Sequence, residues 1–550
     1  AEEVFDLIGK DIQKYQKRSK QSVYSNAVSD ALISADISFV ESGTGTGKSL
    51  GYLLAAMDLL EKSKNEKLII STATKNLQTQ LLEREIPRLA KRFPNMRTSI
   101  LKGKGNYLCL SALKRAYRTW FEQNDPSDAT LESRGAWIYL VNLVHSLNNG
   151  DLEIIPRRLF SWFPSLRQMI QDTNAASHCK VGSCKPELDI YGRIKQKAFM
   201  SDMIITNHYK IASLDDEFMQ SVQYFIIDEA DQFGRAVRNS LSFEVSSKEL
   251  RVFISRLNGS SRRGYLMLLD EYVQGLKRKL TPEEKEKALL LIKQAKRSLI
   301  ELDDLIKNVG ELFFYHLPEW EQRKIKRGIK SHEDFLLEKL PGMNDGKIMK
   351  KYCELISGMM GFLSQKLKEI SEMDKIAQRH RDRCRTYALL SEDFSSTIKT
   401  TGEEFNNDEV AHSLRMVNEK EWVITRHQVY IGEFLQETFY SKGKKMVYTS
   451  ATLSVNNTFD HFKTQYGVDE TMLKVNETSI GTLLDHNIQS VAIVDLSVAQ
   501  YNYKNPEAMK QWRQDITKSI GLYGWAANGR TLVLFTNIMD MNYSFKYLKP

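Results

Sequence analysis

The chain has few cysteines and no long apolar stretch. Five cysteines among 550 residues cannot form a disulfide framework for a fold of this size, so chemistry at a cysteine would be of the metal or redox kind. No apolar run approaches the ~18 residues that a membrane span needs, and Ala1-Glu2-Glu3 does not begin a secretion signal. We therefore expect a cytoplasmic protein with no membrane partner.

The length and charge of the chain set further bounds. A chain of 550 residues exceeds a single hydrophobic core and suggests roughly three or four domains. The formal net charge is +9 and the isoelectric point is about 8.9. This balance is compatible with a polyanionic partner but does not require one.

The stretch from Phe39 to Ser49, FVESGTGTGKS, predicts a strand, a glycine-rich loop and the start of a helix. Successive backbone N–H groups of such a loop curl around a polyphosphate, and the helix N-terminus adds a positive dipole. Lys48 would reach the β- and γ-phosphates of ATP, and the Ser49 hydroxyl would bind Mg²⁺. Ser42 stands where Gly or Ala is usual, and its small side chain should fit. The predicted ATP and Mg²⁺ residues here are Gly43, Gly45, Thr46, Gly47, Lys48 and Ser49.

Gln21 lies about twenty residues before the loop and carries a paired donor and acceptor. It is a candidate for recognition of an adenine edge, and the alternative is an ordinary surface residue.

A buried strand over residues 67–74 runs into a hydroxyl-rich turn, followed by a helix with polar side chains. Ligands bind at strand ends in open α/β sheets, and short hydroxyl and amide groups suit phosphodiester oxygens. We expect DNA contacts from Thr72, Thr74, Asn76 and Gln78. Helix capping by Thr72 or Thr74 would explain those two hydroxyls equally well.

Two more strands complete the predicted site. Residues 224–231, YFIIDEAD, form an apolar strand that ends in carboxylates. Asp228 is suited to holding Mg²⁺ through water, and Glu229 to orienting or deprotonating the attacking water. Lys48, Asp228 and Glu229 are the predicted catalytic residues. Residues 446–453, MVYTSATL, end in Ser450 and Thr452, which would sense the Asp228 region and relay nucleotide state.

These motifs, in this order, resemble those of superfamily 2 helicases. The phrases Ile205-Thr206-Asn207-His208-Tyr209 and Leu101 to Cys109, LKGKGNYLC, resemble the DinG and XPD branch in particular. The resemblance covers essentially the whole chain. It implies an α/β fold with two RecA-like motor domains and ATP-driven 5′ to 3′ translocation on single-stranded DNA, with a 5′-tailed duplex as substrate. Asp231 departs from the branch, which usually has His there, and we expect this to alter coupling more than hydrolysis.

About 180 residues separate Lys48 from Asp228, so a module interrupts the first motor domain. The expected domains are residues 1–102 (RecA-like domain 1, first part), 103–200 (iron–sulfur-like insertion), 201–240 (domain 1, acidic strand), 241–415 (all-helical arch insertion), 416–460 (domain 1, last part) and 461–550 (RecA-like domain 2).

The first insertion raises the question of a four-iron cluster. In the resembled family four cysteines hold it; Cys109 matches the first, and Cys179 and Cys184 match the next pair. Ile190 occupies the expected fourth position. Three thiolates with a fourth ligand from Asp189, His178 or solvent would still hold iron, and a metal-free module is equally compatible with the sequence.

The second insertion predicts long helices. Thr281-Pro282-Glu283-Glu284 is a capping-box start, after which apolar residues recur at spacings of four and three from Ala288 to Val309. A partner stripe is expected along Ile348, Tyr352, Leu355, Met359, Phe362, Leu367 and Ile370. We therefore expect an antiparallel helical bundle. Its apolar stripe would form the core of the bundle and have no catalytic role.

In the second motor domain, residues 490–494 and 529–537 are expected to form strands, and Thr536 and Asn537 would face DNA. The family's later motifs, with the arginines that complete the ATP site, have no counterpart before Pro550. We therefore expect a truncated second domain, and weak ATP hydrolysis if the chain ends there.

The sequence leaves three functional hypotheses. The first is a helicase of the CRISPR-associated DinG group of type IV systems, recruited to an RNA-guided ribonucleoprotein for antiviral defence. This hypothesis rests on the expectation that no nuclease domain precedes the phosphate loop, and on the incomplete cysteine set. The second is a housekeeping DNA-repair DinG. The third is a nucleic-acid-binding scaffold with a vestigial ATPase.

Overall fold

The computed structural model describes residues 5, 19–63, 65–123, 130–146, 150–178, 189–259, 264–276, 280–329, 333–344, 346–405, 407–483, 494–502 and 505–548. The chain divides into two compact units, residues 1–483 and 484–550. None of the helices in the described ranges combines the length and hydrophobicity needed to cross a bilayer.

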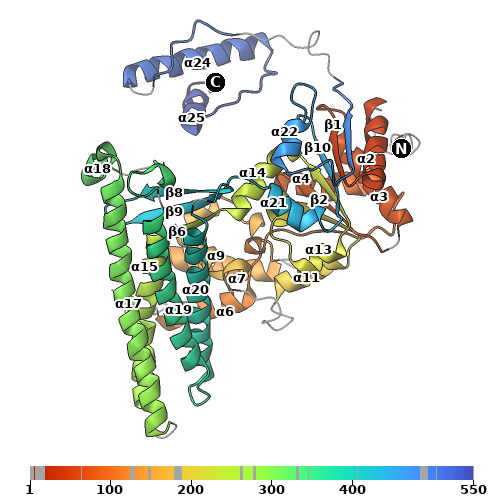
Figure 1. Cartoon of the computed structure of the whole chain (residues 1–550). Coiled ribbons are helices and arrows are strands. Elements are labelled where there is room, and N and C mark those ends of the chain that lie inside the picture. Colours follow the sequence, from red (N-terminus) through yellow and green to blue (C-terminus); the bar gives the residue numbers. More distant parts are fainter. Residues whose placement is uncertain are drawn as a thin grey trace. The chain divides into compact units, whose positions relative to one another are not determined.

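A parallel sheet organises the first unit, and Figure 1 labels its strands β1, β10 and β2. The sheet has seven strands, in the order β11-β1-β10-β5-β2-β4-β3. Apart from β4 and β3, neighbouring strands are not consecutive in sequence, and parallel neighbours need crossover connections. The strands are β1 (Ile37–Glu41), β2 (Leu68–Thr72), β3 (Thr98–Ile100), β4 (Met203–Asn207), β5 (Tyr224–Asp228), β10 (Lys445–Ser450) and β11 (Val475–Ser479). This architecture is the α/β fold expected from the motifs.

Alternating side chains of the strands enter two separate cores, one on each face of the sheet. Phe225 and Ile227 of β5 join the core that contains α14 (Ala230–Leu241). Ile226 joins the core that contains α2 (Ser19–Ser34) and α3 (Lys48–Lys62). A parallel sheet covered on both faces explains why its strands are continuous apolar runs. Shorter helices of this unit are α4 (Lys75–Gln80), α5 (Ile86–Leu89), α12 (His208–Ile211), α13 (Asp216–Ser221), α21 (Gly432–Leu435) and α22 (Asp460–Gln465).

The assignment of residues 461–483 to the second motor domain is wrong. This segment contains α22 and β11, and β11 pairs in parallel with β1 in the first sheet. Pairing of Ile37 with Val475 gives β1 a second neighbour and satisfies backbone groups that an edge strand would leave open. The second unit begins at residue 484.

The segment expected as the first insertion folds around a small core of its own. Its longer helices are α6 (Leu110–Gln123), α7 (Leu131–Ser146) and α9 (Pro164–Thr173), with the short helices α8 (Leu159–Trp162) and α10 (Ala175–His178). Trp137, Leu140 and Leu166 are among the buried residues that these helices share. Helix α11 (Ile190–Phe199) then leads back to β4 of the main sheet.

The second insertion contains long helices, but it is not all-helical as expected. Its helices are α15 (Ser247–Asn258), α16 (Tyr265–Gly275), α17 (Pro282–His316), α18 (Glu319–Lys326), α19 (Lys347–Ser371) and α20 (Gln378–Glu403). A four-stranded antiparallel sheet accompanies them, in the order β6 (Phe243–Ser246), β9 (Trp422–Gln428), β8 (Val410–Met416) and β7 (Phe335–Leu336). Strands β8 and β9 were missed from the sequence because polar residues alternate along them. A sheet with one solvent-exposed face does not give continuous apolar runs.

The capping box at Thr281 and Glu284 is confirmed, and the predicted stripe of α17 is buried from Ala288 to Val309. The predicted stripe of α19 is wrong by one position over most of its length. Leu355 and Phe362 are 44% and 41% exposed. The buried residues are Met349, Cys353, Ile356, Met360, Leu363, Leu367 and Ile370. Helix α19 packs against both α17 and α20, so its core-facing strip is centred between its two partners rather than on one of them.

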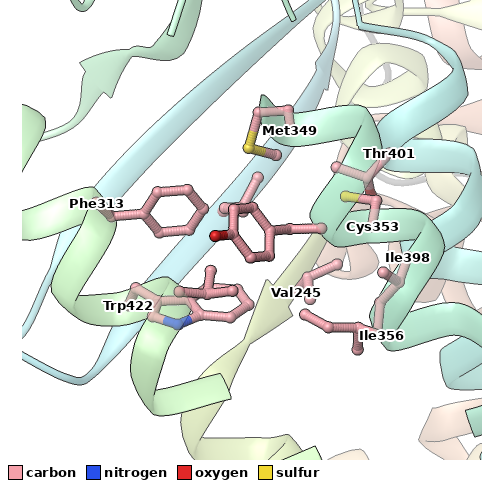
Figure 2. A pocket seen from close by; sticks show the side chains of 11 residues that line it. Val245, Phe313, Met349, Cys353, Ile356, Ile398, Thr401 and Trp422 are labelled. Carbon is pink, nitrogen blue, oxygen red and sulfur yellow. The ribbon is translucent and has the colours of Figure 1, made fainter. Parts of the chain in front are cut away.

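The base of this helical insertion is tightly packed. Figure 2 shows apolar side chains from α17, α19 and the antiparallel sheet, among them Phe313, Met349, Cys353 and Trp422, around a cavity of about 10 Å³. That volume is at the lower limit for one water molecule, and the lining offers it little polar contact. The Trp422 indole N–H instead donates to the Ile306 carbonyl at 3.1 Å. The cavity is therefore a packing defect and not a ligand site.

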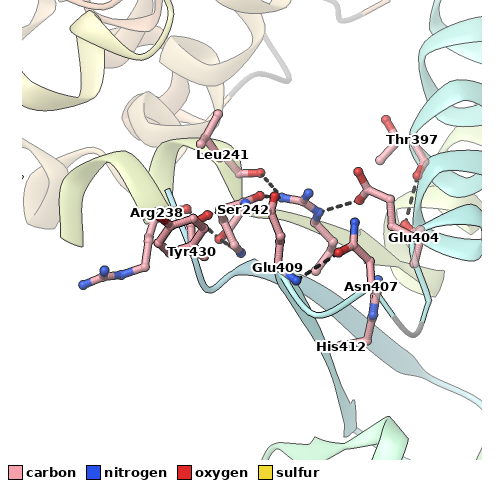
Figure 3. Close-up of polar contacts among 12 residues, drawn as sticks. Arg238, Leu241, Ser242, Thr397, Glu404, Asn407, Glu409, His412 and Tyr430 are labelled. Carbon is pink, nitrogen blue, oxygen red and sulfur yellow. Dashed lines mark hydrogen bonds and ion pairs between the residues drawn. The ribbon is translucent and has the colours of Figure 1, made fainter. Parts of the chain in front are cut away.

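One buried cation, Arg426 of β9, joins this insertion to helix α14. It donates to the Leu241 carbonyl at the end of α14 (3.0 Å) and to the Glu404 carboxylate after α20 (2.7 Å). Figure 3 labels Leu241 and Glu404 and draws both bonds as dashed lines. Charged hydrogen bonds of this kind are about twice as strong as neutral ones. Arg426 therefore fixes the C-terminal end of α14 to the base of the helical insertion.

The second unit consists, in its described residues, of α24 (Pro506–Ala526) and α25 (Ile538–Tyr547). Arg513 pairs with Asp540 at 2.6 Å and joins the two helices. The strand expected over residues 529–537 is not formed, because none of the described residues of this unit supplies a neighbouring strand. Residues 490–493 of the other expected strand lie outside the described residues.

Two helix glycines of the insertion allow a matched test of packing. A Cβ at Gly310 would lie 2.7 Å from the Lys420 carbonyl oxygen, whereas a Cβ at Gly358 meets nothing within 4 Å. We expect Gly310→Ala to lower the free energy of unfolding by about 1–3 kcal/mol. Gly358→Ala should raise it by about 0.5–1 kcal/mol, since alanine favours a helix more than glycine does. Chemical denaturation of the two variants checks both; equal stabilities would contradict the close approach at Gly310.

Candidate nucleotide site

The phosphate loop lies between the end of β1 and the start of α3. Gly45 and Gly47 have φ angles of 81° and 84°, a left-handed backbone that favours glycine. Ser42 is buried and its hydroxyl donates to Thr46 Oγ1 (2.9 Å), which donates to the Gly43 carbonyl (2.9 Å). Ser42 therefore fits the position where Gly or Ala is usual and adds an internal bond.

The backbone N–H of Gly43 already has a hydrogen-bond partner. Its N–H donates to the Gly481 carbonyl at 3.1 Å, and a Cβ here would lie 2.6 Å from the Cα of Thr482. The Lys20 ammonium also donates to the Thr482 carbonyl, at 2.6 Å. Gly43 is thus required for the close approach of residues 481–482, and its N–H is not free for a phosphate in this conformation.

Lys48 begins α3, and its ammonium donates to the Ser42 carbonyl at 2.9 Å across the loop. Burial lowers the pKa of Lys48, and the carboxylates of Asp228, Glu229 and Asp231 oppose that effect. A phosphate in the loop would supply stronger acceptors than one carbonyl, because charge-assisted bonds are the stronger kind.

The acidic strand β5 places Asp228 in a buried position at the carboxyl edge of the sheet. Burial raises the pKa of Asp228, although the Tyr52 hydroxyl donates to Oδ2 (2.9 Å) and the Glu229 N–H to Oδ1 (2.9 Å). Burial and the neighbouring Asp228 and Asp231 carboxylates likewise raise the pKa of Glu229. Glu229 has φ 53° and ψ 47°, an unusual left-handed conformation for a residue with a side chain.

Tyr52 was not anticipated from the sequence. It is fully buried and bonds to Asp228, and a hydrogen bond from Ser49 also reaches its hydroxyl. The sequence signal is its spacing, since a residue four after Lys48 lies on the same face of α3. Ser49, Tyr52 and Asp228 thereby form one connected group.

Strand β10 lies between β1 and β5, so the third motif reaches the same edge of the sheet. Thr449 is in register with Asp228, and Ser450 with Glu41. The Ser450 hydroxyl donates to the Asp231 carboxylate. The structure thus brings Ser450 to Asp231, whereas Thr452 is exposed and lies beyond this contact.

Gln21 lies on α2 and is buried, so the surface alternative is wrong. Its amide donates to the Gly47 carbonyl at 3.0 Å, at the end of the phosphate loop. Nearby Tyr24 is also buried and its hydroxyl bonds to Thr449 Oγ1 at 2.8 Å. Helix α2 therefore contacts both the phosphate loop and the third motif.

The residues at this edge suit Mg²⁺ and a polyphosphate. The Ser49 hydroxyl and the Asp228 carboxylate are hard oxygen donors of the kind that Mg²⁺ prefers. Among the described residues, Lys48 is the cation that acts on Asp228 and Glu229, and Asp231 adds a third carboxylate. This leaves an excess of negative charge for a divalent cation to offset. When bound, the ion would neutralise charge on the β- and γ-phosphates.

Glu41 is a further residue that the sequence did not single out. At the end of β1, its carboxylate accepts from the N–H groups of Leu453 (2.7 Å) and Ser454 (2.6 Å). The Ser454 and Ser479 hydroxyls also donate to it, at 2.9 and 3.2 Å. Partial burial alone would raise the pKa of Glu41, but these bonds lower it below 4.5. Glu41 thus joins the turn after β10 and the end of β11 to the strand that carries the phosphate loop.

The residues expected to contact DNA differ in how exposed their side chains are. Thr74 and Asn76 are exposed, whereas Thr72 and Gln78 are fully buried. The Thr74 hydroxyl accepts from the Leu77 N–H at 3.3 Å and caps α4, so the capping alternative holds for Thr74. In the second unit Thr536 is exposed, and Asn537 caps α25 through the Met539 N–H.

The iron–sulfur hypothesis depends on residues that are not described. Cys179 and Cys184 lie outside the described residues, as does the His178 side chain. Cys109 is buried, and Asp189 Oδ1 accepts from the Gly192 N–H at 2.8 Å as the cap of α11. Among the described side chains, no three potential ligands come together in a way that would hold a metal. The described part of the insertion therefore provides no cluster site by itself.

The first unit is an α/β fold whose large parallel sheet is consistent with a RecA-like domain, and a glycine-rich loop lies at the edge of that sheet. No family model matches the sequence. It is 24% identical over 545 residues to the 3′-5′ exonuclease DinG of Bacillus subtilis, 23% over 548 residues to that of Staphylococcus epidermidis and 21% over 531 residues to that of Staphylococcus saprophyticus. These matches cover 95–96% of this chain and 54% of each relative, so the chain spans about half the length of those proteins. The chain is DinG-like over nearly its whole length.

The lowered pKa of Glu41 gives a pH-dependent prediction. A carboxylate with a lowered pKa in the folded protein adds stability above its unfolded pKa and loses it as pH falls through the folded value. We expect Glu41→Gln to cost about 1 kcal/mol at neutral pH, from weakened hydrogen bonds. The difference between variant and wild type should shrink below a pH of about 4.5. Thermal unfolding from pH 7 to pH 3 checks this, and a constant difference would contradict it.

Proposed function

We propose that this chain is the motor part of an ATP-dependent DNA helicase that moves 5′ to 3′ on single-stranded DNA. The single observation that carries the proposal is the convergence of the phosphate loop, the Asp228-Glu229 turn and the Ser450 strand at one edge of the sheet. In such a site, catalysis is mostly positioning and charge stabilisation. The DinG names of the relatives support a nucleic-acid substrate.

The roles follow from position and charge. Lys48 would hold the β- and γ-phosphates, with Ser49 and Asp228 supporting Mg²⁺. Glu229, with its raised pKa, is suited to accepting a proton from the attacking water. Asp231 and Ser450 would report the state of the nucleotide to the third motif. Thr74 and Asn76 offer exposed polar groups to a DNA backbone beside the site.

Recruitment is the finer part of the proposal. We infer that a type IV CRISPR ribonucleoprotein is the first partner to test, on the grounds of the missing fourth cysteine and the sequence resemblance. A DNA-repair DinG is the alternative. Pull-down with the assembled RNA-guided complex, compared with free single-stranded DNA, separates the two.

Strand displacement tests the motor. We expect ATP-dependent opening of a duplex with a 5′ tail, no opening of a 3′-tailed duplex, and loss of at least 100-fold in rate with Lys48→Ala because the phosphate ligand is gone. The longest natural form of the protein should be used. Tight single-strand binding without opening of either duplex would favour the scaffold hypothesis.

Glu229→Gln separates binding from hydrolysis. The amide keeps the shape of the side chain but cannot accept the proton of water, so ATP should bind and persist. We expect hydrolysis to fall by about 100-fold or more, and ATP to change the single-strand affinity of this variant. Fluorescence anisotropy with labelled DNA measures it, and equal affinity with and without ATP would contradict coupling.

A further inference from the structure

His208 is a buried histidine whose ring contacts two elements beside the nucleotide site, β2 and α14. It follows β4 directly and starts α12, and none of its surface is exposed. Its Nδ1 bonds to the Ser71 hydroxyl of β2 at 2.8 Å, and its ring lies edge-on to Phe233 of α14, with centroids 5.3 Å apart. The ring thus touches the carboxyl end of β2 and the helix that follows Glu229, α14.

The second ring nitrogen of His208 is unused in this conformation. Nε2 is buried and has no hydrogen-bond partner of normal geometry among the described residues. Burial lowers the pKa of His208 to about 4, so the ring is neutral at pH 7 and carries one proton. A Ser71 hydroxyl that donates to Nδ1 leaves this proton on Nε2. A buried donor without a partner is unfavourable, and such a group calls for an explanation.

The His208 ring lies beside the start of α14, because Phe233, which it contacts, comes four residues after Glu229. The backbone of Glu229 and Asp228 acts on the His208 ring and raises its pKa, against the larger effect of burial. At this turn Glu229 has its left-handed backbone, a strained conformation that persists only where neighbours hold it. In the same turn the Glu229 N–H donates to the Asp228 carboxylate, and the Gln232 N–H donates to the Glu229 carbonyl, each at 2.9 Å.

We propose that His208 is a positioning residue for Glu229: in the ATP-bound protein its Nε2–H donates to a backbone carbonyl of the Asp228–Glu229 turn and aims the Glu229 carboxylate at the attacking water. This inference rests on the proposed ATPase function. Ser71 bonds to Nδ1 on the other side of the ring and lies on the strand that leads to Thr74 and Asn76, the exposed residues proposed to contact DNA. His208 therefore lies between that segment and the catalytic turn.

Two substitutions separate the two ring nitrogens. The amide of His208→Asn can reproduce the Nδ1 bond to Ser71 but offers no donor at the Nε2 position. The amide of His208→Gln reaches the Nε2 position. We expect His208→Asn to lower kcat for single-strand-stimulated ATP hydrolysis by about tenfold or more, with little change in KM for ATP, and His208→Gln to restore most of that loss.

His412 provides a matched control in the helical insertion. It is equally buried, its Nδ1 lies 3.2 Å from a Glu338 oxygen, and its Nε2 also has no partner among the described residues. His412→Asn should alter stability without changing kcat. All variants are compared with wild type by thermal unfolding and by binding of a fluorescent ATP analogue.

The outcomes are distinct. A wild type without single-strand-stimulated hydrolysis would overturn the proposed function itself. An active wild type with His208→Asn at the wild-type kcat, or with His208→Gln as impaired as His208→Asn, would overturn the role of Nε2. If His208→Asn does not fold, Ser71→Ala takes its place: we expect a reduced kcat with unchanged ATP binding, and an unchanged kcat would overturn the inference.

Discussion

Asp228 is a carboxylate buried at the end of β5, and a desolvated charge of this kind is tolerated only when neighbours supply hydrogen bonds or opposite charge. Tyr52 and the Glu229 N–H supply the hydrogen bonds, and Lys48 supplies the charge. Tyr52 and Lys48 belong to α3, and the Glu229 N–H belongs to the turn into α14. Both elements must therefore lie beside β5. The need to compensate one carboxylate thus fixes the relative placement of the phosphate loop and the acidic strand.

Helix α14 connects the nucleotide site with the helical insertion. It begins at Ala230, directly after Glu229, contains Asp231, and ends at Leu241, where Arg426 bonds to its last carbonyl group. Arg426 also binds Glu404 after α20, so the helical insertion is anchored at the end of the helix that begins in the nucleotide site. The insertion is therefore attached at a point that would respond to movement of α14.

Much of the motor core follows from the sequence because it depends on local patterns. Apolar runs ending in Asp228 or Ser450 predict strands, and the spacing of Gly47, Lys48 and Ser49 predicts the loop. Tyr52 and Glu41 were missed because their roles depend on which strands become neighbours. That order is set by packing of segments hundreds of residues apart. The same reason explains β11, which has no local sign that it belongs to the first sheet.

The α19 stripe shows a different limit. Two apolar stripes are adjacent along this helix, and periodicity alone cannot choose between them. Contact with both α17 and α20 buries Met360 and leaves Phe362 partly exposed. In the second unit, the apolar run before Thr536 has high strand propensity, but a strand forms only when another strand pairs with it.

The bond between Gly43 and Gly481 ties the phosphate loop to the last residues of the first unit. Gly481 follows β11 closely, and β11 pairs with β1, so this segment is held both to the strand before the loop and to the loop itself. Gly43 would have to release the Gly481 carbonyl before its N–H could donate to a phosphate. Entry of a phosphate would therefore exchange one hydrogen bond of the loop for another and free the segment after β11.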